Sequence, residues 1–144
     1  MKTLRLLALA ALALSPAAMP APAAADENFT VTCASSQLEN GKTSCEGYAL
    51  YTFLSSGPDA KIAIDLTAPP THCSKVSYIV KSGAGTRTFG VTGRMDPGQM
   101  RRIGLGKGHP AGLLTVRIDA FGVVGGCNTG VMQSWGVNAN AVLY

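Results

Sequence analysis

The sequence is poor in the side chains with which most enzymes transfer protons or attack substrates. Its 144 residues include two histidines and eight Asp and Glu residues, and no G-x-S-x-G segment would hold a nucleophilic serine on a sharp turn. His72 and His109 lie near prolines in loop-like sequence, so we expect exposed histidines that at most contact a ligand at the surface. The carboxylates in turns or on the polar faces of strands are expected to face solvent: Asp59, Asp65, Asp96 and Asp119. This composition argues against an enzyme.

The spacings of common metal sites are also missing. The four cysteines are separated by 11, 27 and 53 residues, so no C-x-x-C pair is present and a zinc site is not expected. A soft copper site uses methionine and histidine. Met95, Met100 and Met132 are available for one, but they form no tight Met-x-x-Met array. We therefore predict no metal and no other cofactor.

The first 25 residues contain the one long apolar run, and its shape predicts an export signal. Lys2 and Arg5 precede nine apolar residues at 6–14, and three alanines at 23–25 match the small-residue site that a signal peptidase cleaves. A membrane-spanning helix needs about 20 apolar residues, whereas three prolines interrupt this segment between residues 16 and 22. We expect cleavage after residue 25, no membrane span, and a secreted or periplasmic domain at 26–144.

Positive charge is in slight excess once the signal segment is set aside. Ten of the twelve Lys and Arg residues and all eight Asp and Glu residues fall within 26–144, which leaves a formal excess of two positive charges. A balance this small does not predict nucleic-acid binding, which usually needs a clustered basic face.

Four cysteines in a small exported chain predict two disulfides. Three pairings are possible. We favour Cys33–Cys45, which is local in sequence, and Cys73–Cys127, which would join distant segments. Each bridge is expected to stabilise the fold by about 2–4 kcal/mol, and the bridge that closes the longer loop by more.

Apolar and polar residues alternate in seven or eight short stretches, as in half-buried strands. Turn signals such as Asn40-Gly41 separate them, and no amphipathic helical pattern follows residue 25. The sequence predicts one all-β domain, a small antiparallel β-sandwich that is similar in general architecture to immunoglobulin-like domains. The antibody-type order of Cys, Trp and Cys is absent, because Trp135 follows all four cysteines. The predicted strands cover residues 29–33, 48–54, 61–66, 76–81, 86–92, 102–105, 114–120 and 135–143.

The stretch at 48–54 is apolar on both faces. This pattern is typical of a central strand. It also fits the wall of a barrel that encloses a small ligand.

Positive side chains cluster between residues 87 and 107, where the one acid is Asp96. If the strands at 86–92 and 102–105 pair as a hairpin, several of these side chains lie on one side and suit an acidic partner. The alternative is a solvated face whose charges protect an edge strand from pairing. The candidate contacts are Arg94, Arg101 and Arg102, and the cluster also contains Arg87 and Lys107.

A second candidate surface is the loop-like segment at 127–135. Asn128 and Met132 belong to residue types that are common at recognition surfaces, and we take them as candidate contacts. Trp135 closes the segment, but it also begins an apolar stripe along the last predicted strand. We therefore favour a core position for the tryptophan, beside the Cys73–Cys127 bridge.

These features favour a non-enzymatic exported protein with a structural or macromolecule-binding role. The partner would be an unknown macromolecule, and the arginines suit an acidic one. An alternative is a small-ligand carrier with a barrel-like apolar cavity. A metal handler or an enzyme that uses His72 or His109 ranks last. The sequence does not set the oligomeric state.

Overall fold

The protein is an all-β domain of ten strands. The computed structural model describes residues 26–144, and the expected signal segment at 1–25 lies outside the described residues. Within 26–144 there is no helix, and so none that is long and apolar enough to cross a membrane. The strands are β1 (Glu27–Thr32), β2 (Ser36–Glu39), β3 (Lys42–Cys45), β4 (Ala49–Ser55), β5 (Ile62–Thr67), β6 (Val76–Ser82), β7 (Thr88–Val91), β8 (Met100–Gly106), β9 (Gly112–Val123) and β10 (Ser134–Leu143).

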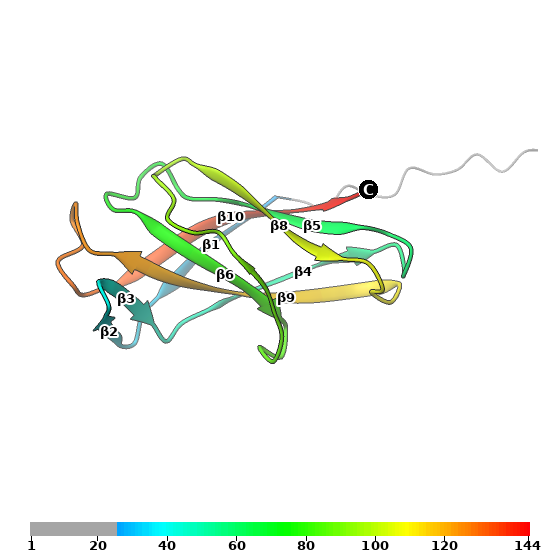
Figure 1. Ribbon diagram of the computed structural model, residues 1–144, viewed down its shortest axis with the longest axis horizontal. Coiled ribbons are helices and arrows are strands. Elements are labelled where there is room, and N and C mark those ends of the chain that lie inside the picture. The colour runs from blue at the N-terminus through cyan, green and yellow to red at the C-terminus, as the bar shows by residue number, and fades with distance from the viewer. Residues whose placement is uncertain (1–25) are drawn as a thin grey trace, which may run out of the picture.

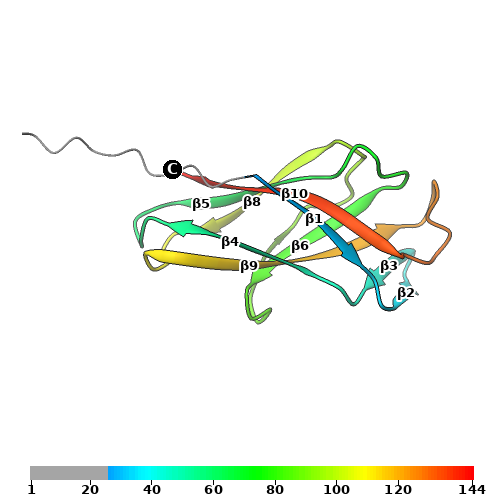
Figure 2. The ribbon, with the colours of Figure 1, turned by 180° about the vertical axis from the view of Figure 1, so that it is seen from behind.

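The strands form two antiparallel sheets that pack face to face (Figure 1, Figure 2). The four-stranded sheet has the order β1-β10-β5-β8. In the six-stranded sheet the long strand β9 is central. One edge of β9 pairs with β6, which in turn pairs with β7, and the other edge pairs in succession with β4 and β3. The predicted antiparallel β-sandwich is confirmed, with ten strands in place of seven or eight.

Alternating apolar side chains from both sheets fill the space between them, and their burial is the main stabilising contribution. Two tyrosine hydroxyls connect the sheets by hydrogen bonds. Tyr78 of β6 donates to the carbonyl oxygen of Gly136 at 2.6 Å, and the N–H of Ala141 donates to the hydroxyl of Tyr51 in β4 at 3.0 Å. The largest buried side chains are Trp135, Tyr51, Tyr78, Ile62, Ile64, Leu66, Met95 and Ile118.

The hairpin of β2 and β3 was not among the predicted strands. Its residues are mostly Ser, Thr, Gln and Lys, so they show no apolar alternation. The turn signal inside it was right, because Asn40 and Gly41 join the two strands with φ angles of 51° and 73°. Two positive φ angles are typical of the tight turn that Asn-Gly favours in hairpins.

Two expectations about strand neighbours were wrong. Among the described residues β4 pairs with β9 alone, so 48–54 forms an edge strand and not a central one. Its apolar character on both faces arises because Tyr51 and Phe53 point into the core while Leu50 and Leu54 remain exposed. The segments at 86–92 and 102–105 do not pair as a hairpin, because β7 pairs with β6 and β8 pairs with β5 of the other sheet.

Both favoured disulfides are present, with Cα–Cα distances of 5.2 Å for Cys33–Cys45 and 5.6 Å for Cys73–Cys127. The first joins the chain after β1 to the end of β3. The second joins the β5–β6 connection to the β9–β10 connection. Two disulfides indicate an oxidising, extracytoplasmic environment.

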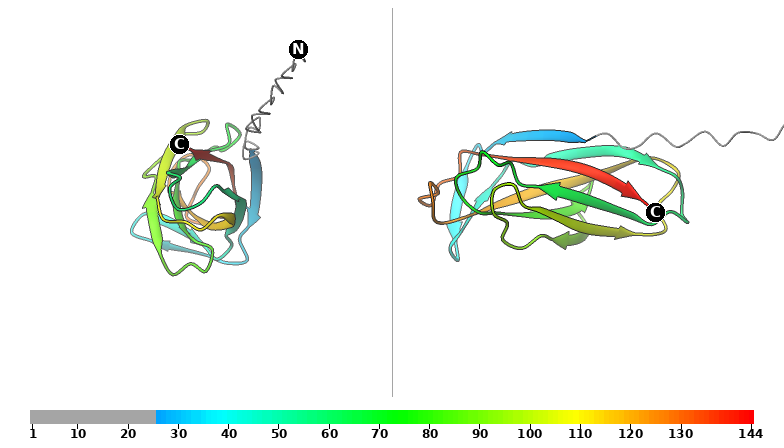
Figure 3. Two further views of the ribbon diagram at one scale, coloured as in Figure 1. Left: turned by 90° about the vertical axis from the view of Figure 1, so that its right-hand side faces the viewer. Right: turned by 90° about the horizontal axis from the view of Figure 1, so that it is seen from above.

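The sandwich is elongated and has two long sides and two ends (Figure 3). On the β7–β8 side, Gly90 of β7 faces Ile103 of β8 across the two sheets. On the opposite, β1–β4 side, the rings of Phe29 and Tyr51 meet edge to face with centroids 6.1 Å apart. We call the end that holds the β5–β6 and β9–β10 connections the pocket end. The end that holds the β4–β5 and β8–β9 turns is the closed end.

Candidate functional site

Free positive charge gathers on the β7–β8 side. Arg94 lies in the connection from β7 to β8, Arg101 lies in β8, and Lys107 follows directly after it; all three are exposed. Among residues 26–144 none of the three has a carboxylate partner. The guanidinium of Arg87 lies over the ring of Phe89, 5.0 Å from its centroid. This side therefore presents cations whose charge is not neutralised within the described domain.

Arg102 differs from its neighbour because its charge is already matched. Alternate residues of a strand point to opposite faces, so Arg102 lies over the outer face of the four-stranded sheet. There it donates two hydrogen bonds to Asp65 in β5, at 2.6 and 2.7 Å. The hydrogen bond to Asp65 raises the pKa of Arg102. The structure thus separates Arg102 from Arg94 and Arg101, with which the sequence had grouped it.

Free negative charge lies mostly on the opposite long side. Five exposed carboxylates have no cationic partner among the described residues. Four lie in or beside β1, β2 and β3, namely Asp26, Glu27, Glu39 and Glu46, and the fifth, Asp59, lies in the turn between β4 and β5. The carboxylates elsewhere are mostly paired. Asp119, which is buried, binds Lys81 and Arg117 at 2.7 Å each, and Asp96 binds Lys75 at 3.0 Å. The unpaired charges therefore give the sandwich a basic and an acidic long side.

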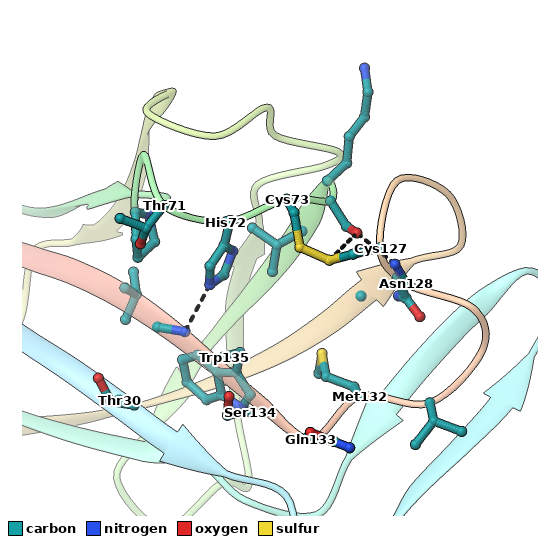
Figure 4. A pocket seen from close by; sticks show the side chains of 18 of the residues that line it. Thr30, Thr71, His72, Cys73, Cys127, Asn128, Met132, Gln133, Ser134 and Trp135 are labelled. Carbon is teal, nitrogen blue, oxygen red and sulfur yellow. Dashed lines mark hydrogen bonds between the residues drawn. A yellow bond between two sulfur atoms is a disulfide. The ribbon is translucent and has the colours of Figure 1, made fainter.

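A pocket of about 720 Å³ opens at the pocket end between the two sheets. Its walls come from β1, from the β5–β6 connection, and from the chain between the end of β9 and the start of β10. Figure 4 shows His72 and the Cys73–Cys127 disulfide above the opening, with Trp135 and Met132 below them. This volume falls in the range of about 300–1,000 Å³ that is usual for small-molecule sites.

Asn128 and Met132, two of the predicted contacts, lie in this wall, but both are largely buried, with exposed fractions of 8% and 9%. The amide nitrogen of Asn128 donates to Thr43 at 3.0 Å and to the carbonyl oxygen of Val123 at 3.1 Å, and its amide oxygen accepts from the N–H of Gly130. The polar groups of Asn128 are thus used to hold the loop. Its role and that of Met132 in binding stay predictions.

Trp135 lies in the core beneath the pocket, as expected, with an exposed fraction of 2%. Its ring packs against Tyr78 with centroids 6.0 Å apart. The indole Nε1 is buried and has no hydrogen-bond partner among the described residues. A buried donor without a partner is rare in native proteins.

His72 and His109 are not the pair of exposed loop histidines that the sequence predicted. His109, at the closed end, has an exposed fraction of 8%, bonds through Nε2 to the carbonyl oxygen of Leu105 at 3.1 Å, and meets the ring of Phe89. His72 is half-buried in the pocket wall, where its Nε2 accepts a hydrogen bond from the N–H of Gly136 at 3.2 Å. Burial lowers the pKa of His72. Within 26–144, no group of three His, Cys, Asp or Glu side chains is placed to hold a metal ion.

Sequence reasoning missed the pocket itself. Its lining comes from segments around residues 28–30, 69–76 and 127–137, which are far apart in the chain. The Cys73–Cys127 pairing was the available signal, because it places His72 and the loop before Trp135 side by side.

Comparisons with known proteins identify no family. No family model matches the sequence, and no curated protein matches it. Solved structures match over 94% of the chain, among them the infectious bursal disease virus VP2 subviral particle, with 17% identity and a TM-score of 0.37. The infectious bursal disease virus Gx strain structure matches with 16% identity and a TM-score of 0.34. The chain spans 37% and 36% of those two chains. Similarity of this degree supports no inference about function.

Proposed function

We propose that this is an exported, non-enzymatic β-sandwich protein with a structural or macromolecule-binding role, and that its β7–β8 side binds an acidic macromolecule. The observation that carries the proposal is the pair of exposed arginines, Arg94 and Arg101, that have no carboxylate partner among residues 26–144. Guanidinium groups bind carboxylate and phosphate groups in a planar, two-pronged geometry. Export to the periplasm or the exterior agrees with the two disulfides.

The remaining polar groups support a binding role over catalysis. Asp65 and Asp119, which lie in mid-strand, are bound in ion pairs, and His109 is bound to a backbone carbonyl. The carrier alternative, with a barrel-like cavity behind 48–54, is weaker, because Tyr51 and Phe53 pack in the core between the sheets.

The test compares two charge-reversal variants for binding to a surface coated with poly-glutamate, at low and at physiological salt. In Arg94→Glu with Arg101→Glu we expect the affinity to fall more than tenfold, since opposite charges are replaced by like charges at the contact. The matched control, Lys42→Glu with Lys61→Glu, changes the net charge equally at exposed positions on the other side and at the closed end. It should retain most of the binding. An equal loss in both variants would show that net charge alone is responsible and would refute the proposed surface.

The same variants identify one special case of an acidic partner. The β1–β4 side of a second copy carries unpaired carboxylates, Glu27 and Glu39 among them. The apparent molecular mass of the protein in solution is measured at increasing protein concentration and low salt. If this mass rises, and Arg94→Glu with Arg101→Glu abolishes the rise, the partner is another copy of this chain.

A further inference from the structure

The pocket end is separate from the basic β7–β8 side and has its own unpaired polar groups. Two hydrogen-bond donors line the pocket without an acceptor among the described residues. We propose that the pocket binds a small molecule through an acceptor oxygen, a carbonyl or a carboxylate, which accepts hydrogen bonds from these two donors.

The first donor is the indole N–H of Trp135. This residue has an exposed fraction of only 2%, and it forms part of the pocket wall. Its Nε1 has no partner in residues 26–144. Tryptophan nitrogen can only donate, so the missing partner is an acceptor. Met132, a flexible side chain, lies beside the tryptophan in Figure 4 and can adapt its shape to a ligand.

The second donor is the imidazole of His72. The backbone N–H of Gly136 can only donate, so Nε2 of His72 must be the acceptor in their 3.2 Å hydrogen bond. The neutral ring therefore carries its proton on Nδ1. Burial lowers the pKa of His72, which favours this neutral form. No described residue accepts a hydrogen bond from Nδ1.

A backbone hydrogen bond links His72 to the chain beside Trp135. His72 bonds to Gly136, the residue that follows Trp135, and a side chain at Gly136 would come within 3.1 Å of the carbonyl oxygen of Phe29 and of Pro69. Tyr78 binds the carbonyl oxygen of the same glycine from below. The position of both donors is thus set before any ligand arrives, which reduces the entropy that binding has to offset.

Two other polar residues of the wall are already bonded within the domain. Ser74 accepts from the N–H of Asn128 at 2.9 Å and donates to the carbonyl oxygen of Gly125 at 2.8 Å. The Lys75 ammonium is bound to Asp96. The rest of the wall combines apolar surface, at the Cys73–Cys127 bridge and Met132, with polar side chains such as Thr30, Thr71 and Gln133. A ligand that matches this wall has some apolar surface for the bridge and Met132 and an oxygen acceptor for the two donors.

The test uses the single tryptophan of the chain, which gives one indole N–H signal in a ¹H–¹⁵N spectrum. The oxidised protein is titrated with 2-naphthoate, with 2-acetylnaphthalene and with 2-methylnaphthalene, which has no acceptor. We expect one or both oxygen-bearing probes to move the indole signal downfield in a saturable manner and the hydrocarbon not to do so. A shift with the acid alone identifies a carboxylate site, and a shift with the ketone alone identifies a carbonyl site. No shift with any probe, or the same shift with all three, overturns the proposal.

Variants test the two donors separately by calorimetry. Trp135→Phe keeps an aromatic ring but removes the N–H, and we expect it to weaken binding of the oxygen-bearing probe roughly tenfold. His72→Leu should have a similar effect. Tyr51→Phe alters a buried hydroxyl far from the pocket and serves as the matched control, with binding unchanged. If Trp135→Phe folds and binds the probe as tightly as the unaltered protein, the proposal is wrong. If it does not fold, the titration of the unaltered protein decides.

Discussion

The two ends of this sandwich use similar residues in opposite ways. Each end has a histidine in a connecting loop and a buried tyrosine hydroxyl bound to β10. At the closed end, His109 bonds to Leu105, and Lys61 and Tyr144 exchange two backbone hydrogen bonds of 2.9 Å. At the pocket end, Nδ1 of His72 and Nε1 of Trp135 have no acceptor among residues 26–144. One end satisfies its polar groups internally, and the other leaves donors unsatisfied around a cavity.

Within one small domain, the closed end therefore contributes to stability, and the pocket end has features that suit ligand binding. A protein gains stability by pairing buried polar groups and loses it when a donor is left alone. Binding sites are among the places where such a loss is retained. The disulfide Cys73–Cys127 lies at the end that holds the pocket, where a covalent link offsets the cost of an unpaired donor.

The largest effect should come from removing that link. In the chain-entropy account, Cys73→Ala with Cys127→Ala opens a loop with a sequence separation of 54 residues and lowers the free energy of unfolding by about 4 kcal/mol. Cys33→Ala with Cys45→Ala opens a separation of 12 residues and should cost about 3 kcal/mol. Urea unfolding of both variants measures the difference. A larger loss from the shorter loop would contradict the chain-entropy account of these bridges.

The second-largest effect is expected from replacing the histidines, and the loss of stability should differ between the two. His109→Ala removes a buried ring, its hydrogen bond to Leu105 and its contact with Phe89, and we expect a loss of about 2–3 kcal/mol in the free energy of unfolding. His72→Ala removes a half-buried ring beside an open pocket and should cost less than about 1.5 kcal/mol. Thermal and urea unfolding provide the comparison. Equal losses would mean that the two ends are packed equally well.

The tyrosine hydroxyls should show smaller and local effects. Tyr78→Phe removes the 2.6 Å bond to Gly136 and should cost about 1–1.5 kcal/mol, and Tyr51→Phe leaves the N–H of Ala141 without that acceptor at a similar cost. Amide hydrogen exchange should separate them. Faster exchange is expected around Gly136 in the first variant and at Ala141 in the second. Exchange that rises equally along all of β10 would show that the ends are not independent.

The smallest effect concerns pH. Burial lowers the pKa of His72 below its ordinary value of 6.5, so the unfolded chain binds this proton more readily than the folded protein does. The stabilising contribution of the neutral ring is therefore complete above about pH 6.5 and is lost as the pH falls from there through the lowered pKa. His72→Gln keeps an acceptor for Gly136 and should flatten this part of the stability profile. An unchanged slope between pH 6.5 and 5 would contradict the assignment.

The sequence predicts the strands with one buried face better than it predicts their surroundings. Ile62, Ile64 and Leu66 alternate with less buried or smaller residues, so β5 is recognisable from its pattern. The β2–β3 hairpin is not, because Thr43 is buried only through its contacts with Gly122 and Asn128, which lie about 80 residues further along the chain. Edge and central strands also look alike locally, as β4 shows, because pairing depends on long-range partners.

The candidate site was less predictable for the same reason. The arginines of the β7–β8 side could be grouped from sequence, but the pairing of Arg102 with Asp65 follows from the neighbouring positions of β5 and β8. The unsatisfied indole of Trp135 depends on every group around it and has no local signature.

The pairing of β1 with β10 sets the order in which this domain can fold. β1 is the first described strand and β10 the last, and Glu27 lies opposite Ala139. β3 and β4 likewise cannot join the sheet until β9 is available, because β9 is the strand with which each pairs toward the centre of the sheet. A chain that is synthesised from its amino end therefore exposes several strands before the residues that complete either sheet are available. Such non-local pairing makes folding slow, and the sandwich can close only once β9 and β10 are present.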